Sequence, residues 1–400
     1  MASSEVHLSR ERKGIGKSLL LTLPILLWSL LMFTSWFQQQ KALPKIAGLI
    51  TAAFMVFLFY KMVRTRTTYR WRRWFFVALG FLFPVGFIYN VYTMRGSMGI
   101  PVEEMIAGRT PFCFLPIPML ILPAAFTKTV AFPGSILPGG GMAGAGIAAM
   151  VGIWLAITLV VGKGWCSYAC FFGGIEEGMA AAPSAAKIKK IDHRWRYMPW
   201  AVLLAMVLLT FALFEPAYCM WLCPFKAVSE YVAARNLIGM IQNAIFIILF
   251  LGLVIALPLL TKKRTQCSFL CPFGAFQSVF NKISVFDVKI DQSKCTPCVL
   301  CEKSCPTMSL NQESIAEGKT LMSCMKCGAC VDACPRDAVA WHIRGTDVSV
   351  KPERARLMFL YGAWAMATMF GGSIIAQGVL TLLQGGQALV QKLQAMQAFL

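Results

Sequence analysis

Eight cysteines form two copies of one pattern, Cys-x2-Cys-x2-Cys-x3-Cys-Pro, and the copies begin 29 residues apart. Three thiolates so closely spaced can bind one 4Fe-4S cluster, and the fourth reaches the cluster of the other copy. A structural zinc site is the alternative, but zinc sites usually pair two Cys-x2-Cys units or use His, which favours clusters here. We therefore predict two 4Fe-4S clusters, the first bound by Cys295, Cys298, Cys301 and Cys334 and the second by Cys324, Cys327, Cys330 and Cys305.

Six more cysteines occur as three Cys-x3-Cys pairs, Cys166/Cys170, Cys219/Cys223 and Cys267/Cys271. On a helix the two thiols of such a pair face the same way. A Pro follows the second Cys of the last two pairs, which suits the start of a new helix with backbone N–H groups near the thiolates. We hypothesise that Cys166, Cys170, Cys267 and Cys271 bind an additional iron-sulfur centre; the alternative is that they are buried or redox-labile thiols without a cluster. Cys219 and Cys223 are weaker metal candidates and could instead form a reducible disulfide.

Hydrophobic residues make up 57% of the chain and charged residues only 14%, so these cysteines lie in a membrane protein. Seven apolar stretches approach the length that crosses a hydrocarbon core of about 30 Å. They are residues 18–37, 46–61, 74–93, 142–162, 198–215, 239–260 and 357–381. A further stretch, 112–141, is broken by Pro and Gly and is either re-entrant or a kinked span.

The predicted fold class is thus mainly α, a polytopic helical membrane protein of about seven spans with a small α+β two-cluster ferredoxin-like module. We divide the chain into a basic N-terminus (1–17), a membrane domain with Cys-x3-Cys motifs (18–266), the third motif with the ferredoxin-like domain (267–350), and a C-terminal transmembrane helix and tail (351–400).

The net charge of +20 comes from basic residues clustered at span ends, such as Arg72 and Arg264, rather than on a soluble domain. This pattern argues against nucleic acid and for anionic membrane lipid as the partner of these charges. By the positive-inside rule, the N-terminus and the cluster domain face the cytoplasm of a multi-pass inner-membrane protein, and the middle Cys pair faces the outer side. Glu176 and Glu177, just after the first pair, are expected to be interfacial and solvated.

The three histidines are His7, His193 and His342, and none lies within a predicted span, so no haem b is expected. No Cys-x2-Cys-His motif for haem c and no dinucleotide or P-loop fingerprint is present. Clusters, with quinone as a further partner, are therefore the expected carriers of electrons.

The segment from Cys267-Ser-Phe-Leu-Cys271-Pro-Phe-Gly through Pro335 resembles the NapH/NosR group of membrane iron-sulfur proteins. The resemblance implies electron transfer between a quinol pool or a partner and a terminal reductase or its maturation system, as a subunit of a quinol dehydrogenase type complex in the respiratory chain. It also implies that Cys166/Cys170 and Cys267/Cys271 are the group's two pairs. Phe171 replaces the Pro after the first pair, and Cys219/Cys223 is an extra pair. A metal-reducing assembly factor of the CcoG type shares this layout and is the alternative function.

Overall fold

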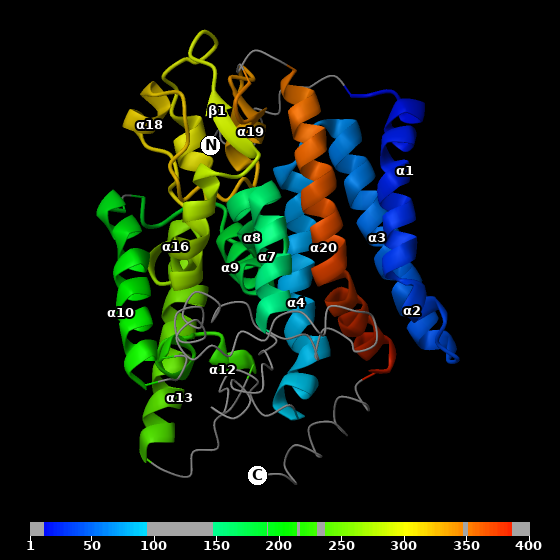
Figure 1. Cartoon of the computed structure of the whole chain (residues 1–400), viewed down its shortest axis with the longest axis vertical. Helices are drawn as coiled ribbons and strands as arrows, with labels where there is room; N and C mark the ends of the chain where they lie inside the picture. Colours follow the sequence, from blue (N-terminus) through cyan, green and yellow to red (C-terminus); the bar gives the residue numbers. More distant parts are fainter. Residues whose placement is uncertain are drawn as a thin grey trace.

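The computed structural model of the chain describes residues 12–93, 147–189, 191–213, 217–229, 237–346 and 351–385. It is a bundle of long helices with a small module that contains a two-stranded sheet at one end (Figure 1). The predicted re-entrant stretch 112–141, together with Cys113, lies outside the described residues, as do residues 1–11 and 386–400.

The N-terminal part of the bundle consists of α1 (Ile15–Met32), α2 (Thr34–Phe37), α3 (Ala42–Thr65) and α4 (Tyr69–Thr93). The description resumes at residue 147. The helices that follow are α7 (Ile147–Val161), η2 (Gly162–Gly164), α8 (Trp165–Tyr168) and α9 (Phe171–Ala181). The following part contains η3 (His193–Tyr197), α10 (Met198–Leu213), α11 (Ala217–Trp221), α12 (Lys226–Ser229), α13 (Leu237–Leu249), the π-helical η4 (Phe250–Ala256), α14 (Leu257–Thr261), α15 (Thr265–Phe269), α16 (Pro272–Val279) and η5 (Phe280–Lys282). The long helix α20 (Pro352–Leu383) closes the bundle.

Five helices within the described residues are long and apolar enough to cross a membrane: Ile15–Met32, Ala42–Thr65, His193–Leu213, Leu237–Thr261 and Pro352–Leu383. A sixth candidate is a pair, Gly152–Tyr168 and Phe171–Ala181, bent by 48°. The predicted third span corresponds to α4, which has 25 residues but is not among these candidates, so the total of seven spans stays a prediction. The fourth predicted span is therefore part of a bent element, and the first Cys pair lies at its bend.

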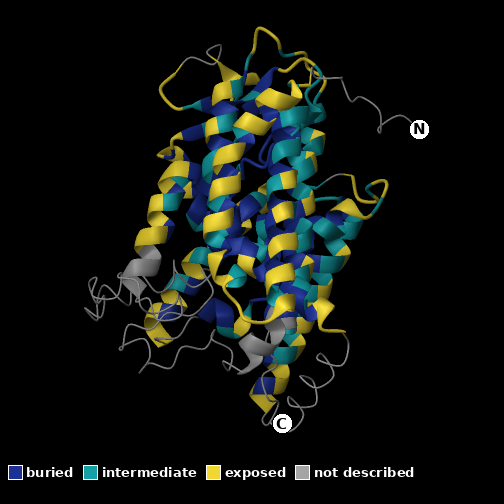
Figure 2. Ribbon diagram, turned by 90° about the vertical axis from the view of Figure 1, so that its right-hand side faces the viewer, coloured by how far each residue is buried: buried dark blue, intermediate teal, exposed yellow. Residues whose placement is uncertain are grey.

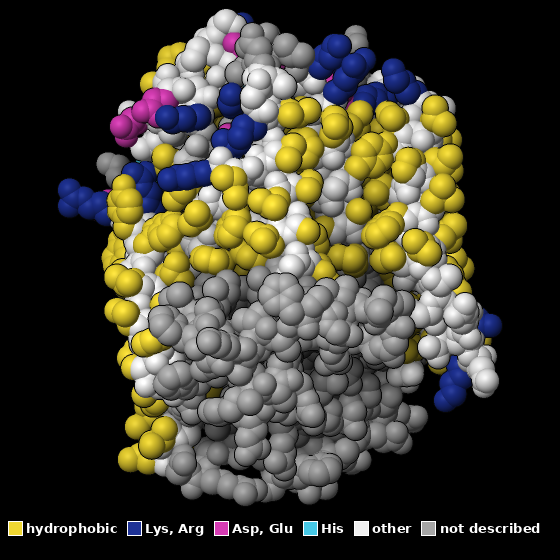
Figure 3. All heavy atoms as spheres, in the orientation of Figure 1, with side chains coloured by type: hydrophobic (Ala, Val, Ile, Leu, Met, Phe, Trp, Pro, Cys, Tyr) yellow, Lys and Arg dark blue, Asp and Glu magenta, His cyan; other side chains and the backbone are white. Residues whose placement is uncertain are grey.

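The outer surface of the bundle is apolar. Large side chains such as Leu20, Leu204 and Leu237 are more than 60% exposed, and the helices turn their exposed sides outward (Figure 2). Hydrophobic atoms cover the visible helices in Figure 3, whereas most Lys and Arg side chains gather at the end that carries the module. Such a surface is stable only in contact with lipid or partner helices, which supports a membrane location.

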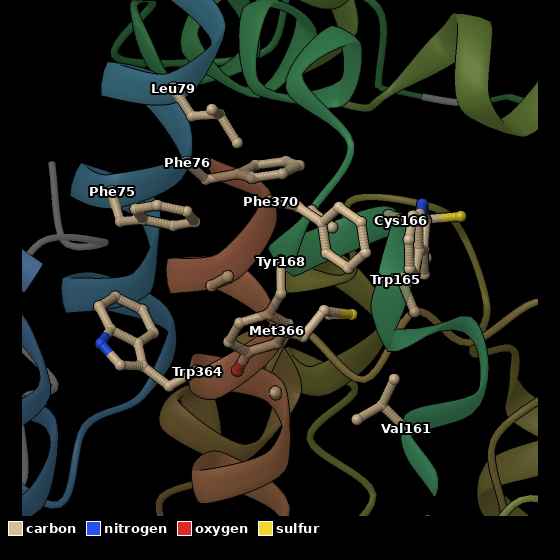
Figure 4. Close-up of a cluster of buried hydrophobic side chains, with 14 of the residues drawn as sticks. Phe75, Phe76, Leu79, Val161, Trp165, Cys166, Tyr168, Trp364, Met366 and Phe370 are labelled. Atoms are coloured by element: carbon tan, nitrogen blue, oxygen red, sulfur yellow. The ribbon is translucent and has the colours of Figure 1, made fainter. Parts of the chain in front are cut away.

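The core between α4, α8 and α20 is rich in aromatic side chains (Figure 4). Trp364 lies 5.1 Å from Phe75, and Trp165 lies 4.8 Å from Phe370, measured between ring centroids. The sulfur of Cys166 is directed away from this cluster. One side of α8 thus packs into the aromatic core, and the sulfur of Cys166 lies on the side of α8 that faces away from this core.

Helices α4 and α9 approach each other through two glycines. A Cβ atom on Gly174 would lie 2.1 Å from the carbonyl oxygen of Phe76, and one on Gly80 would lie 2.4 Å from the backbone N of Ile175. Only residues without a side chain permit this distance between the two backbones. The close approach places the carboxylates at the middle of α9 against α4.

The module contains strands β1 (Phe286–Ile290) and β2 (Val339–Ile343), which pair antiparallel with Phe286 opposite Ile343 and Ile290 opposite Val339. Between them lie α17 (Leu300–Ser304), α18 (Gln312–Ala316) and α19 (Ala329–Ala333). The three short helices and the sheet agree with the predicted small α+β unit. The cysteine pattern accounts for this size, because closely spaced ligands leave room for only one helical turn between them.

Candidate iron-sulfur sites and a buried charge cluster

The first predicted ligand set surrounds one cavity. Cys295, Cys298, Cys301 and Cys334 all line one pocket in the module. Cys298 is exposed, Cys295 and Cys334 are half-buried, and Cys301 is buried. The structure thus joins the first three cysteines of copy one to the last cysteine of copy two, as the spacing predicts. This set reaches the surface of the protein.

The second predicted set surrounds a second pocket, which is lined by Cys305, Cys324, Cys327 and Cys330. Three of these cysteines are buried and Cys324 is half-buried. Burial raises the pKa of the Cys324 thiol to about 11. This thiol is therefore protonated at neutral pH, and a bound metal must displace its proton. The second set is the more enclosed of the two.

The number of cysteines around each of these pockets fits a cluster better than a single ion. Among the described residues, no three His, Cys, Asp or Glu side chains converge as tightly as one metal ion requires. A 4Fe-4S cluster is wider than one ion, and its four thiolate ligands lie around it at the corners. Four cysteines around one enclosed space suit that group. Binding of a cluster by each set stays a prediction.

The two copies also share their backbone conformation. Val299 and Gly328, at equivalent positions before α17 and α19, both have positive φ, 51° and 87°. The backbone N–H of Ser309 donates to the sulfur of Cys305 at 3.2 Å, and that of Ala338 donates to the sulfur of Cys334 at 3.3 Å. Such N–H···S bonds stabilise negative charge on the sulfur and influence the reduction potential of a bound cluster. The internal duplication inferred from the spacing is thus present in three dimensions.

The module is attached to the membrane helices by polar contacts. The carboxylate of Asp332 in α19 accepts hydrogen bonds from the backbone N–H groups of Thr68 at 3.1 Å and Tyr69 at 2.7 Å, and so caps the N-terminus of α4. The hydroxyl of Ser167 in α8 donates to the carbonyl of Met325 at 2.6 Å. The side of the module that carries the second, enclosed set is therefore the side bound to the membrane domain.

A short hydrogen-bonded path links the second set to the first Cys pair. The backbone N–H of Lys163 donates to the amide oxygen of Asn281 at 2.9 Å, and the amide nitrogen of Asn281 donates to the carbonyl of Cys324 at 2.7 Å. Lys163 lies three residues before Cys166 in the chain, and its buried side chain donates to the hydroxyl of Ser278 at 2.8 Å. The path therefore joins the second set to the segment that carries the first pair.

The four thiols of the hypothesised membrane centre are close neighbours. One nitrogen, Nη2 of Arg264, donates to the carbonyl of Cys166 and to the sulfur of Cys267, each at 3.1 Å. The pairs come from α8 and the N-terminus of α9, and from α15 and the N-terminus of α16. The structure thus brings the first and third pairs together, as expected, although a cluster between them stays a prediction.

The local geometry of the pairs differs from the prediction. The two cysteines of a pair do not share one helix, because the first lies in a short helix and the second follows its end. Cys170 and Cys271 are instead the N-cap residues of α9 and α16. The expectation about Pro is confirmed at Pro272, which begins α16 and leaves the N–H of Gly274 free to donate to the sulfur of Cys271 at 3.3 Å.

The middle pair, Cys219 and Cys223, is fully buried and lies close to the other two pairs. Phe225, two residues after Cys223, stacks on Phe172, two residues after Cys170, with centroids 4.1 Å apart. Tyr218 accepts a hydrogen bond from the side chain of Gln266 at 2.8 Å. The expectation that the pairs lie on opposite faces is therefore wrong, because the chain after α10 folds back into the protein.

Four charged side chains, all at most 1% exposed, form a cluster beside the membrane thiols. Glu177 pairs directly with Arg72, and its other oxygen lies 3.6 Å from Nη1 of Arg264. Glu176 lies 3.8 Å from Nε of Arg264 and accepts the backbone N–H of Gln266 at 2.6 Å. The expectations of solvated carboxylates and lipid-facing arginines at these positions are therefore wrong. Two positive and two negative charges offset one another, which permits their burial.

Sequence reasoning missed Lys163, Asn281 and Asp332 as functional residues, and it misread Arg264. Their roles depend on partners far away in the chain, and no local motif marks them. A partial signal existed for Arg264, because a charged residue three positions before a ligand cysteine can reach its sulfur if both lie in one helical turn.

Comparisons with known proteins agree with these sites. Residues 287–335 match the family model of a 4Fe-4S dicluster domain. Residues 142–190, 198–240 and 243–291 each match the family model of a 4Fe-4S binding domain. Each of these three segments contains one Cys-x3-Cys pair, so the chain between residues 142 and 291 is a threefold repeat. No solved structure matches the chain.

Several relatives share part of the chain. An uncharacterized protein of Methanocaldococcus jannaschii is 29% identical over 209 residues, which are 50% of this chain and 80% of the relative. The putative electron transport protein YccM of Escherichia coli is 24% identical over 56% of this chain and 61% of its own length. The ferredoxin-type protein NapH of Haemophilus influenzae is 26% identical over 35% of this chain and 68% of its own length. The chain is thus a relative of the membrane ferredoxin-type proteins that carries 4Fe-4S binding domains, which confirms the resemblance seen in its cysteine motifs.

Proposed function

We propose that the chain relays single electrons through three thiolate sites that follow one another from the surface of the module into the membrane domain. Iron-sulfur clusters supply one-electron chemistry when bound. The order of the sites is supported by burial: Cys298 of the first set is exposed, whereas three cysteines of the second set are buried. A soluble donor or acceptor can therefore approach the first set, and the second set is shielded from it.

The observation that carries this proposal is the path from Lys163 through Asn281 to Cys324. Electron tunnelling decreases exponentially with distance, and hydrogen bonds carry it better than empty space. Gly162 makes the close approach possible, because a Cβ atom there would lie 2.4 Å from Nζ of Lys326 and 2.5 Å from Oδ1 of Asn281. The module and the membrane thiols are thus held together at the point where a relay needs a short distance.

We further propose that the lipid-soluble partner is a quinone, which binds in a groove beside the third Cys pair. The groove has a volume of about 430 Å³, and its walls include Trp195, Leu257, Phe269 and Leu270. Phe269 and Leu270 lie between Cys267 and Cys271 in the chain. Asp192 and Thr261 are polar residues of its lining. Apolar walls with few polar groups are typical of sites for such ligands.

Iron analysis tests the relay. Replacing all eight module cysteines by Ser removes the predicted two clusters, and we expect iron for one further cluster to remain in the purified protein. Adding Cys267→Ser and Cys271→Ser to that variant is the matched control and should abolish the remaining iron. If the eightfold variant already lacks iron, the membrane centre does not exist and the relay ends in the module.

Reduction by a quinol analogue in detergent tests the groove. Leu257→Trp fills the groove and should slow reduction of the clusters by the quinol at least tenfold, with no effect on their reduction by dithionite. Leu204→Trp, at a position on α10 that is 63% exposed, adds the same bulk to the outer surface and should change neither rate. Equal quinol rates in the two variants would contradict the site.

A metal-reducing assembly factor is the alternative function, and the buried extra pair Cys219/Cys223 is the feature that favours it. Stoichiometric copper binding that Cys219→Ser abolishes, together with negligible quinol oxidation, would support this role. In either case we propose that the protein resides in the bacterial inner membrane with the module on the cytoplasmic side, working with other redox subunits. The clustering of basic side chains at the module end supports this orientation (Figure 3).

A further inference from the structure

The loop between α14 and α15 contains a guanidinium group that contacts both the module and the membrane thiols. Arg264 is 0% exposed. Its backbone N–H donates to the carbonyl of Pro306 at 2.8 Å, directly after Cys305 of the second set. Its Nη2 donates to the sulfur of Cys267 at 3.1 Å and to the carbonyl of Cys166 at 3.1 Å. One residue thus joins the first pair, the third pair and the module.

The position of this guanidinium is tightly fixed. It lies 5.2 Å from the ring centre of Phe76 and forms ion pairs with Glu176 and Glu177. A Cβ atom on Gly173 would lie 1.8 Å from the Nη2 atom of Arg264. The absence of a side chain at Gly173 therefore leaves the space that the guanidinium occupies. Arg264 therefore cannot turn away from the Cys267 sulfur without breaking several buried contacts, and its charge stays at one distance from the thiols.

We infer that Arg264 is a positioning residue that raises the reduction potential of the centre bound by Cys166, Cys170, Cys267 and Cys271, an inference that rests on the proposed membrane centre. A cluster becomes more negative by one charge when it takes up one electron. A permanently charged guanidinium that donates to a ligand sulfur stabilises that extra charge. Hydrogen bonds to sulfur and local charge are among the factors that set cluster potentials.

Glu176 acts in the opposite direction. Its carboxylate lies beside the Arg264 guanidinium and also accepts the backbone N–H of Cys267 at 3.3 Å. It therefore offsets part of the positive charge near the thiols and orients the ligand backbone. Removing its charge leaves more of the Arg264 charge to act on the centre. The potential thus depends on the balance between one guanidinium and its carboxylate partners.

A redox titration of the full-length protein, followed by electron paramagnetic resonance, tests this inference. The signal of the membrane centre is the one that Cys267→Ser removes. For Arg264→Gln we expect at least a tenfold smaller equilibrium constant for reduction of this centre, which is about 59 mV for a one-electron couple. Arg264→Lys keeps the charge but loses the planar fork and should give a smaller decrease. Glu176→Gln should shift the potential upward.

The matched control is Arg356→Gln. Arg356 is also a buried arginine paired with a carboxylate, that of Glu353. Its side chain donates to no cysteine of the described part of the chain, so its loss should leave the membrane signal in place. A membrane signal with the same potential in the Arg264 variants and the unsubstituted protein overturns the inference but leaves the relay intact. Absence of that signal from the unsubstituted protein overturns both. If Arg264→Gln loses the membrane centre, the other two variants test the inference. Arg264→Lys should lower the reduction potential of the centre and Glu176→Gln should raise it. If both variants shift the potential in the same direction, the charge balance is contradicted.

Discussion

Asp332 attaches the ferredoxin-like module to the membrane domain, and its substitution by Ala should release that attachment. The carboxylate accepts the backbone N–H groups of Thr68, Tyr69 and Arg70 at 3.1, 2.7 and 3.4 Å. These are the unpaired donors at the N-terminus of α4, which every helix leaves without an intrahelical partner. The cap comes from a residue more than 260 positions later in the chain, so its loss weakens a tertiary contact and a helix end together.

The structure allows the size of this effect to be worked out. Replacing a capping side chain by Ala costs about 0.5–2 kcal/mol, and the favourable interaction of a carboxylate with the helix dipole adds about 0.3–1 kcal/mol. Asp332 is only half-buried, so we take the combined value as about 1–3 kcal/mol rather than summing three charged hydrogen bonds. That free energy corresponds to a roughly 5- to 150-fold shift toward the detached state. Asp332→Asn, which keeps an acceptor but loses the charge, should lie between Ala and the unsubstituted protein.

Hydrogen exchange followed by mass spectrometry in a membrane mimetic measures this shift. Exchange at the start of α4 should accelerate by that factor in Asp332→Ala, since local opening free energies set exchange rates. The matched control is Glu317→Ala, which removes a carboxylate from the same module, where it forms an exposed ion pair with Lys319. Such pairs contribute less than about 1 kcal/mol. Unchanged protection at Thr68 and Tyr69 in Asp332→Ala would refute the capping role.

Three further predictions concern packing, backbone strain and the exposed cluster site. Gly174→Ala forces a Cβ atom against the Phe76 carbonyl and should destabilise the protein by about 1–3 kcal/mol. Thermal unfolding in detergent would detect this loss of stability. The control is Gly152→Ala, which has open space around the new Cβ atom and should be neutral. Val299 is a β-branched residue with φ of 51°, and such a left-handed conformation costs about 1–2 kcal/mol. Val299→Gly relieves this backbone strain, so the cluster should be lost on heating only at a higher temperature. Loss at a lower temperature would contradict the strain. Cys298→Ser should reduce the iron content by one cluster and slow reduction by a soluble donor, whereas an unchanged donor rate would show that electrons enter elsewhere.

The local motifs of the chain determined much of the candidate site by themselves. Ligands of a cluster are spaced by covalent geometry, so the eight module cysteines and their crossed pairing through Cys305 and Cys334 can be read from spacing, and the structure groups them as expected. Long apolar runs likewise predict membrane helices, because a helix must satisfy its backbone hydrogen bonds within the lipid. The Pro after Cys271 correctly predicted a new helix there.

Tertiary structure alone decided the surroundings of these ligands. A charge at the end of an apolar stretch looks the same in sequence whether it faces lipid headgroups or lies in the interior, so Arg72, Arg264, Glu176 and Glu177 were assigned to the interface. Their burial depends on opposite charges that folding brings together from α4, α9 and the loop before α15. The same holds for Asp332, whose function arises only when the module lies against α4. Spacing within a segment is set by the covalent chain, whereas contacts between distant segments are set by packing, and for that reason the ligands could be predicted and their electrostatic environment could not.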